Sequence, residues 1–359
     1  MKNSKRTIPQ LPQLDVELTE RCNNNCVHCC INRPANDRRA QRRELSVSQL
    51  DDVFKQAAAL GCLTVRLTGG EPLLRPDFER IYLAARRRGM KVKLLTNACL
   101  LTPGLARLFR DVPPLEKISI TAYGHDRKSY ESVTRVPGSF ARFERGLALL
   151  KEHGVPFELK GVIFRATTGH RKKLAAWIRR RTGAKPEMVT MLDLRHRRDS
   201  ARRNERISRL RLGPGQAARI ICADPLFRKQ MVLFPKRYMG ARGAKLFACS
   251  AGRSVCLDAY GRLQPCLLLR KRRLTYDLGK GTLKDALTNF FPQALAATAK
   301  NKQYLDRCAK CGLKGFCNQC PAKSYIEYGV LDKPVEYLCR VAHAQAERLG
   351  WENETSLVR

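Results

Sequence analysis

Residues 22–29 read Cys-Asn-Asn-Asn-Cys-Val-His-Cys and follow directly on an apolar run at 14–18 that has the composition of a β-strand. Three and then two residues separate the cysteines, and a tight loop of this length can turn three sulfurs toward one point. Three thiolates on a four-iron cube leave one iron without a protein ligand, where a small chelating molecule can bind. A structural zinc site needs a fourth ligand instead, which His28 or Cys30 would supply. The loop by itself leaves both interpretations open.

A second motif follows the next expected strand. The residues at 63–68 have the pattern of a strand and lead into Gly69-Gly70-Glu71-Pro72. This strand end is where a parallel barrel places its chemistry. Paired glycines let the backbone come close to a ligand, and Glu71 can accept hydrogen bonds from an amino group.

The first half of the chain alternates short β-rich runs with helical patterns, which predicts βα units and a parallel sheet. The clearest helix begins after Ser46, which forms a capping box with Gln49, and ends at Gly61. The expected strands are fewer than the eight of a closed barrel, so we expect an α/β fold with a partial barrel. These strands are 14–18, 63–68, 91–96, 116–121, 157–164 and 187–192.

We divide the chain into four segments. Residues 195–245 are rich in Arg and are broken by Gly213-Pro214-Gly215, which is typical of a connector with one or two helices. A cysteine-dense region follows it. The expected segments are a partial (β/α)6 TIM-like barrel at 1–194, a helical connector at 195–245, a small cysteine-rich α+β iron-sulfur domain at 246–340 and a C-terminal tail at 341–359.

The cysteine-dense region holds enough thiols for two fully ligated four-iron clusters. The stretch 249–266 also predicts a hairpin with Gly261 at its turn. Zinc ribbons use similar CxxC pairs, so the spacing alone does not distinguish iron-sulfur clusters from zinc. The spacing is Cys249-x6-Cys256-x9-Cys266, then Cys308-x2-Cys311-x5-Cys317-x2-Cys320, and finally Cys339.

Together, the motifs at 22–29 and 69–72 resemble the radical S-adenosylmethionine (SAM) superfamily, whose members carry CxxxCxxC after the first barrel strand and a GGEP-type motif after the second. The resemblance covers about the first 200 residues. It implies that Cys22, Cys26 and Cys29 hold a [4Fe-4S] cluster whose open iron is chelated by the methionine part of SAM. Agreement of the two motifs and their strand context favours this interpretation over zinc. The SAM contacts that the resemblance implies are Gly69, Gly70, Glu71, Asn97 and Ser119.

The C-terminal cysteines resemble the SPASM extension found in radical SAM enzymes that mature peptides and proteins. Cys256 is the least secure ligand that this resemblance implies, because its position varies in the family, and a first auxiliary cluster with three protein ligands is the alternative. The implied sets are Cys249, Cys256, Cys266 and Cys320 for the first auxiliary [4Fe-4S] cluster, and Cys308, Cys311, Cys317 and Cys339 for the second.

Four cysteines are left without an assigned cluster. Cys62 and Cys99 adjoin expected strands, and we expect them to be buried as small apolar residues. No role is predicted for Cys30 or Cys222. Asp193, Asp258 and Glu158 lie near strand ends or turns, but solvated or structural roles are favoured for them, so no catalytic acid or base is assigned.

The resemblance implies an oxidoreductase that cleaves SAM to a 5′-deoxyadenosyl radical, with an electron from reduced flavodoxin or ferredoxin. The favoured function is that of a maturase, which oxidatively modifies a peptide or protein with help from the auxiliary clusters. Oxidation of a small tetrapyrrole or quinone precursor is one alternative, and an iron-sulfur protein attached to nucleic acid is another. Only 21 residues precede Cys22, so we expect a separate peptide-recognition protein or direct docking of the substrate.

Composition narrows these choices further. Fifteen cysteines without an apolar secretory signal favour metal ligation in the cytoplasm over disulfides. No apolar run is long enough for a membrane span. The formal net charge of +37 makes acidic partners plausible, but Lys and Arg are spread widely and no nucleic-acid-binding motif is found, so we favour solvated surfaces over a nucleic-acid site.

Overall fold

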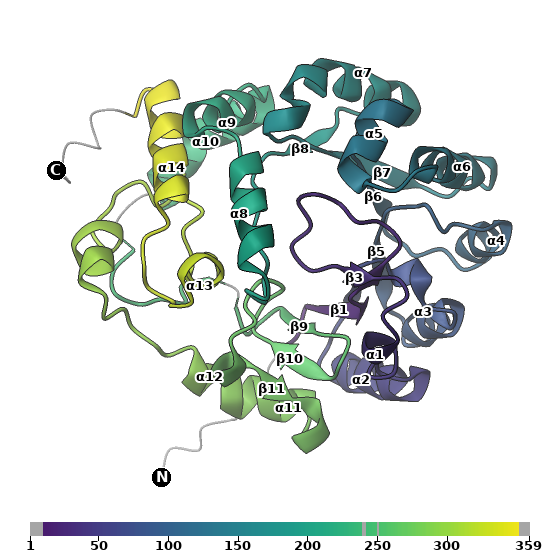
Figure 1. The fold of residues 1–359 in the computed structure, drawn as a ribbon. Coiled ribbons are helices and arrows are strands. Elements are labelled where there is room, and N and C mark those ends of the chain that lie inside the picture. The colour runs from purple at the N-terminus through teal and green to yellow at the C-terminus, as the bar shows by residue number, and fades with distance from the viewer. Residues whose placement is uncertain (1–9, 239–241, 250, 352–359) are drawn as a thin grey trace, which may run out of the picture.

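The computed structural model describes residues 10–238, 242–249 and 251–351. In this part of the chain nine strands form one sheet in the order β11-β10-β9-β1-β4-β5-β6-β7-β8 (Figure 1). Six adjacent strands of this sheet are parallel, as the alternating pattern predicts, so the partial-barrel prediction is confirmed. They are β1 (Gln13–Thr19), β4 (Thr64–Gly69), β5 (Lys91–Thr96), β6 (Ile118–Ala122), β7 (Phe157–Val162) and β8 (Glu187–Val189).

The two faces of the barrel sheet differ in chemistry. Leu14, Val16 and Leu18 of β1 belong to the main hydrophobic core, which lies between the sheet and its helices. Asp15 and Glu17 alternate with them and are also buried, although they point to the other face. The strand is therefore buried on both faces, with an apolar outside and a charged inside.

Helices cover the outer face of the barrel strands. Figure 1 shows α2, α3, α4 and α6 ranged along one side of the strands, with the cysteine-rich region on the other side. The predicted capping box is confirmed, because Ser46 accepts from the amide of Gln49 and Gln49 accepts from the amide of Ser46. The bounds are α1 (Arg38–Gln41), α2 (Val47–Ala59), α3 (Phe78–Arg87), α4 (Pro103–Asp111), α5 (Arg127–Thr134), α6 (Ser139–Glu152) and α7 (Arg171–Thr182).

The connector holds three helices in its described residues, where the sequence pattern predicts one or two. They are α8 (Ala201–Leu210), α9 (Pro214–Ile221) and α10 (Pro225–Tyr238). The predicted break at Gly213 and Pro214 is confirmed, since it separates α8 from α9, but the pattern missed one further helix. Gly213 is the N-cap of α9 and Pro214 its first residue, a position where a missing N–H costs nothing.

The predicted hairpin is confirmed, and it joins the barrel sheet. β9 (Val255–Leu257) and β10 (Arg262–Gln264) are antiparallel, with Gly261 at a positive φ of 83° in the turn, and β11 (Tyr276–Asp277) follows. β9 also pairs in parallel with β1, so that Cys256 lies in register with Asp15. The apolar residues of the hairpin share the core of the barrel, so the cysteine-rich region continues the barrel sheet.

The described residues of the C-terminal region hold four further α-helices: α11 (Leu283–Asp285), α12 (Phe291–Ala294), α13 (Pro321–Tyr328) and α14 (Glu336–Arg348). The expected boundary between 340 and 341 falls inside α14, which packs against α9 through its buried side chains. Residues 352–359 of the expected tail lie outside the described residues. In the described part, no helix combines the length and apolar character that crossing a bilayer requires.

Replacing Leu257 with Ala tests whether the hairpin is part of the barrel core. Leu257 is fully buried in that core, so its truncation should lower the free energy of unfolding by about 2–5 kcal/mol in urea denaturation. Val330→Ala, at a side chain that is 43% exposed, is the matched control and should change it by less than about 0.5 kcal/mol. Equal effects of the two variants would contradict a shared core.

Candidate functional site

The cysteine loop lies at the C-terminal end of β1 and is held by backbone hydrogen bonds. Its two ends pair as short strands, β2 (Arg21–Cys22) and β3 (Arg33–Pro34). In between, the amides of Asn25 and Val27 donate to the carbonyls of Thr134 and Val133 at the end of α5, each at 3.0 Å. The loop is thus fixed to the barrel at both ends and in the middle.

The three loop thiols influence one another electrostatically. Burial raises the pKa of Cys22 and of Cys26, and the neighbouring thiols raise both further. Amide groups point at two of the sulfurs, because Asn24 N–H donates to Cys22 Sγ and Asn32 N–H to Cys29 Sγ, both at 3.4 Å. Buried thiolates need positive charge close by, and an iron-sulfur cluster supplies it.

Around the loop lies a cavity of about 520 Å³. It is lined by Cys22 and Cys26, and by arginines from the end of α5 and from α8. Several buried polar atoms of the loop have no hydrogen-bond partner among the described residues: Asn23 Nδ2, both side-chain atoms of Asn24 and His28 Nδ1. Buried polar groups are normally satisfied, so these atoms fit a bound group. The three thiols and the orphaned atoms are compatible with a cluster and a polar ligand.

The two glycines of the second motif are needed for a backbone contact. Gly69 has a φ of 137°, and a Cβ there would lie 2.1 Å from the carbonyl oxygen of Thr19. A Cβ on Gly70 would lie 2.3 Å from the carbonyl oxygen of Arg21. The amide of Gly70 donates to Thr19 O at 2.7 Å. The sequence pattern predicts a close approach to a ligand, and the described contact is to the strand end that leads into the cysteine loop.

Glu71 is fully buried and accepts hydrogen bonds from its own chain. Its Oε1 accepts from Thr96 Oγ1 at 2.7 Å and from the amide of Leu73 at 3.0 Å, and its Oε2 accepts from the amide of Asn97 at 2.7 Å. Burial raises its pKa to about 7, while these hydrogen bonds lower it. Oε2 keeps an acceptor position for a further donor such as an amino group.

Of the weaker predicted SAM contacts, Asn97 lies at the loop. Its Nδ2 donates to Asn23 Oδ1 at 2.8 Å and lies 3.8 Å from Cys22 Sγ. Ser119 is buried on β6, in register with Leu95 of β5 and Glu158 of β7. The structure therefore brings Asn97 to the cysteine loop and leaves Ser119 on the wall of the barrel.

The second predicted auxiliary site is assembled. All four of its predicted ligands line one cavity of about 170 Å³ between α14 and the preceding loops. Burial and the neighbouring thiols raise the pKa of Cys308 to about 12. The lining thiols are Cys308, Cys311, Cys317 and Cys339.

The first predicted auxiliary site is assembled in part. Burial raises the pKa of Cys266 to about 11, and the nearby thiols of Cys320 and Cys249 raise it as well. Burial also raises the pKa of Cys320, again with a contribution from the Cys249 thiol. Cys256 points to the inner face of the barrel, and the charged groups that act most on its pKa are Glu17, Arg270, Asp15 and Asp258. The described geometry thus gathers three of the four predicted thiols and keeps Cys256 apart.

The remaining cysteines are buried or enclosed. Cys62 and Cys99 are 4% and 2% exposed, as predicted, and Cys222 is buried as well. Cys30 lies among Cys29, Asp193 and Arg270. In the described residues, no three His, Cys, Asp or Glu side chains are grouped to hold a single metal ion.

A network of buried charges, which was not predicted from the sequence, lies behind the cysteine loop. Glu20 is fully buried and pairs with Arg33, Arg197 and Arg270, and it accepts from the hydroxyl of Tyr260 at 2.8 Å. Arg270 also pairs with the buried Glu17. Asp15, Glu17 and Thr19 alternate with apolar residues in the sequence, and this alternation could have predicted a strand with one polar face.

The three carboxylates considered as polar candidates have structural partners. Asp258 Oδ1 accepts from the amides of Tyr260 and Arg262 in the hairpin turn, at 2.9 and 3.0 Å. Asp193 pairs with Lys323, and the partly exposed Glu158 lies 3.4 Å from the amino group of Lys160. These contacts agree with the structural roles favoured by the sequence.

Comparison with known proteins identifies the barrel. The model of the radical SAM superfamily matches residues 16–178. This segment is a radical SAM domain. Radical SAM domains use a [4Fe-4S] cluster and SAM, so the predicted cofactors agree with the family.

Several curated relatives match less than half of this chain. The AdoMet-dependent heme synthase of Methanosarcina barkeri is 31% identical over 147 residues, which are 41% of this chain and 41% of that protein. The PqqA peptide cyclase of Gluconobacter oxydans is 32% identical over 170 residues, 44% of each chain. This chain thus spans less than half the length of these relatives.

Other similarities extend through the cysteine-rich region. The antilisterial bacteriocin subtilosin biosynthesis protein AlbA of Bacillus subtilis is 25% identical over 86% of this chain and 66% of its own. The structure of anSMEcpe with bound AdoMet and Cp18Cys peptide has a TM-score of 0.62 at 15% identity, over 96% of this chain and 98% of that one. SuiB of Streptococcus suis, bound to S-adenosylmethionine, has a TM-score of 0.60 at 15% identity, over 92% and 75%. The predicted fold, a partial barrel followed by a cysteine-rich region, is confirmed.

Gly70→Ala tests the backbone contact between the two motifs. The added Cβ would collide with the carbonyls of Glu20 and Arg21, so we expect a loss of about 3 kcal/mol in unfolding free energy and a lower iron content after reconstitution. Gly104→Ala is the control, because the nearest atom to its Cβ would be 3.8 Å away. Full iron loading of Gly70→Ala would show that the contact is dispensable.

Cys256→Ala tests the described geometry of the first auxiliary site. If three thiols hold that cluster, Cys256→Ala keeps the iron content of the wild type, whereas Cys320→Ala loses about four iron atoms per chain. Iron and sulfide analysis with electron paramagnetic resonance of the reduced proteins measures both. Equal losses in the two variants would assign Cys256 as a ligand.

Proposed function

We propose that this chain is an enzyme that reductively cleaves SAM and oxidatively modifies a peptide or protein substrate. The observation that carries the proposal is the gathering of three separate thiol sets on one radical SAM fold. One set lies in the loop at the barrel mouth, and two lie in the C-terminal region that continues the barrel sheet.

The first set fits the SAM-binding cluster. Cys22, Cys26 and Cys29 would hold a [4Fe-4S] cluster, and the carboxylate of Glu71 would accept from the amino group of SAM. When bound, the cluster and SAM supply a 5′-deoxyadenosyl radical that abstracts a hydrogen atom from the substrate. The loop amides that donate to sulfur would stabilise the thiolates.

The other two sets fit auxiliary clusters. Cys308, Cys311, Cys317 and Cys339 would hold one of them, and Cys249, Cys266 and Cys320 would hold the other, with Cys256 as the disputed fourth ligand. Four thiolates close a cluster to further ligands, whereas three leave one iron open. With Cys256 as a ligand, both auxiliary clusters would be closed and could pass electrons. Without it, the first auxiliary cluster would keep an open iron that could also bind a substrate atom.

A peptide substrate is favoured by the relatives that match beyond the barrel. AlbA, named for subtilosin biosynthesis, matches over 86% of this chain. The anSMEcpe structure contains a peptide, and SuiB has been solved with its precursor peptide SuiA. A short Cys- or Gly-rich reading frame beside the gene would supply a candidate substrate, whose loss of hydrogen mass after reaction would support the proposal.

The electron donor would approach the cysteine loop. Arg202, Arg203 and Arg206 of α8 line the cavity around Cys22 and Cys26, together with Arg135. A positive rim of this kind steers acidic proteins, which suits a reduced flavodoxin or ferredoxin in the cytoplasm. A separate peptide-recognition protein stays part of the proposal.

A small cofactor precursor is the second candidate substrate. It is favoured by the match to the AdoMet-dependent heme synthase, which covers 41% of this chain. Incubation of the reduced enzyme with a tetrapyrrole precursor, followed by mass analysis, separates the two candidates. Turnover of that precursor without turnover of any peptide would replace the leading proposal.

Cys29→Ala tests the proposed chemistry directly. After anaerobic reconstitution with iron and sulfide, it should lose about four iron atoms per chain and form no 5′-deoxyadenosine from SAM under dithionite. Cys222→Ala is the matched control, since Cys222 is a buried cysteine away from the three sets, and it should retain both properties. Formation of 5′-deoxyadenosine by Cys29→Ala, or its absence from the wild type, would refute the proposal.

A further inference from the structure

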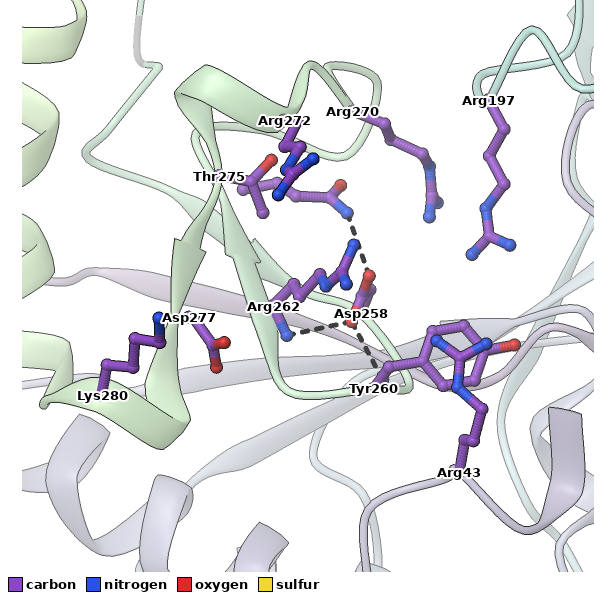
Figure 2. A pocket seen from close by; sticks show the side chains of 11 residues that line it. Arg43, Arg197, Asp258, Tyr260, Arg262, Arg270, Arg272, Thr275, Asp277 and Lys280 are labelled. Carbon is purple, nitrogen blue, oxygen red and sulfur yellow. Dashed lines mark hydrogen bonds between the residues drawn. The ribbon is translucent and has the colours of Figure 1, made fainter.

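A half-open cavity of about 490 Å³ lies on the C-terminal hairpin, outside the three thiol sets. Figure 2 shows Arg197 and Arg270 reaching toward the turn that carries Asp258 and Tyr260, while Arg43 lies against Tyr260 from another side. Asp258 and Asp277 are the acidic members of the lining. The cationic members are Arg43, Arg197, Arg262, Arg270, Arg272 and Lys280.

Strand register places this cavity on the inner face of the barrel sheet. Arg262 is in register with Asp277, and Gln264 is in register with Cys256. Cys256 is in turn in register with Asp15 of β1. Because residues in register share a face, the cavity continues the polar inner surface of the barrel beyond β1.

The positive charge of the cavity exceeds the negative charge of its own acids, because six cationic side chains and two carboxylates line it. The Asp258 carboxylate accepts amides in the hairpin turn, and Asp277 accepts from the amide of Gly279 at 3.0 Å. Among the residues that the structure describes, four cationic members of the lining form no ion pair. They are Arg43, Arg262, Arg272 and Lys280.

Two buried polar groups at the cavity lack partners within the described chain. Gln264 is 2% exposed, and its Oε1 accepts no hydrogen bond, while its Nε2 lies 3.5 Å from Asp258 Oδ2. The side chain of Arg270 is 4% exposed, and its Nε donates to no acceptor. Leaving such groups unpaired costs free energy, so they point to a ligand that supplies both an acceptor and a donor.

The cavity is connected to the cysteine loop through one carboxylate. Glu20 lies two residues before Cys22. Its carboxylate accepts a hydrogen bond from the hydroxyl of Tyr260 and forms ion pairs with Arg197 and Arg270. Tyr260 is also covered by Arg43, whose guanidinium carbon lies 4.5 Å from the ring centre. A ligand held in the cavity is therefore anchored to the same short segment that carries the first thiol of the loop.

We propose that this cavity binds an acidic segment of the substrate peptide. In this complex, substrate carboxylates form ion pairs with Arg262 and Arg272, and a backbone amide of the peptide donates a hydrogen bond to Gln264. The inference rests on the proposed function, whose substrate class it specifies. A peptide supplies carboxylate acceptors for the arginines and N–H donors for Gln264 Oε1, whereas a phosphate group has no amide donor. Phosphate sites are commonly built from backbone amides at helix N-termini, and this cavity is lined mainly by side chains of strands and turns.

Binding of fluorescein-labelled hexaglutamate to the full reconstituted chain, measured by fluorescence anisotropy, tests the inference. Hexaglutamine with the same label is the uncharged control peptide. We expect Arg262→Gln/Arg272→Gln to weaken hexaglutamate binding about tenfold, the effect of removing two charge contacts at exposed side chains. Arg179→Gln/Arg180→Gln removes the same charge from the exposed end of α7 and should change the Kd by less than about twofold.

Equal weakening by the two double variants would overturn the inference, because it would show that net charge alone attracts the peptide. Competition by inorganic phosphate or by hexathymidylate at lower concentration than free hexaglutamate would also overturn it, in favour of a phosphate or nucleic-acid site. The measurement involves no SAM cleavage, so its failure leaves the proposed function intact. Conversely, selective peptide binding without 5′-deoxyadenosine formation would reject the proposed function alone.

Discussion

The site depends on the close contact between the ends of β1 and β4. Gly69 and Gly70 allow the β4 backbone to lie against Thr19, Glu20 and Arg21, and the amide of Gly70 closes the contact by a hydrogen bond. From there, Glu71 ties the end of β4 to β5 through Thr96 and Asn97, and Asn97 reaches back to Asn23. Three strand ends and the cysteine loop are thereby joined in one hydrogen-bonded unit, which fixes where the three thiols lie.

The buried charges behind the loop join the barrel to the C-terminal region. Glu17 and Glu20 come from the barrel strand and its continuation, while Arg197 and Arg270 come from the connector and the cysteine-rich region. Removing one partner of a buried pair costs roughly 3–5 kcal/mol, since the other charge is left uncompensated. The network therefore specifies one arrangement of the two regions, in addition to the apolar core that they share.

The high positive charge of the chain is used unevenly. Many arginines lie on exposed helix faces, where they are solvated, as the sequence pattern favours. Others gather at two places close to the cysteine loop: beside α8, around the cavity of the first thiol set, and on the hairpin, around the cavity without thiols. In a half-enclosed cavity a cation is screened less than on an open surface, so these few arginines can select partners although they are a small share of the total.

The sequence by itself determined the repeating elements and the ligand types. Alternating runs predicted six parallel strands, with β5 at its observed bounds, and Ser46, Gln49 and Gly61 marked one helix at both ends, because period and capping are local properties. The cysteine motifs predicted three thiol sets. Only the tertiary structure decided which residues come into contact. It pairs β9 with β1, turns Cys256 to the barrel interior, and brings Arg270 to Glu20 across 250 residues of chain. Such contacts follow from strand pairing and burial between distant segments, which leave no periodic trace in the sequence around either partner.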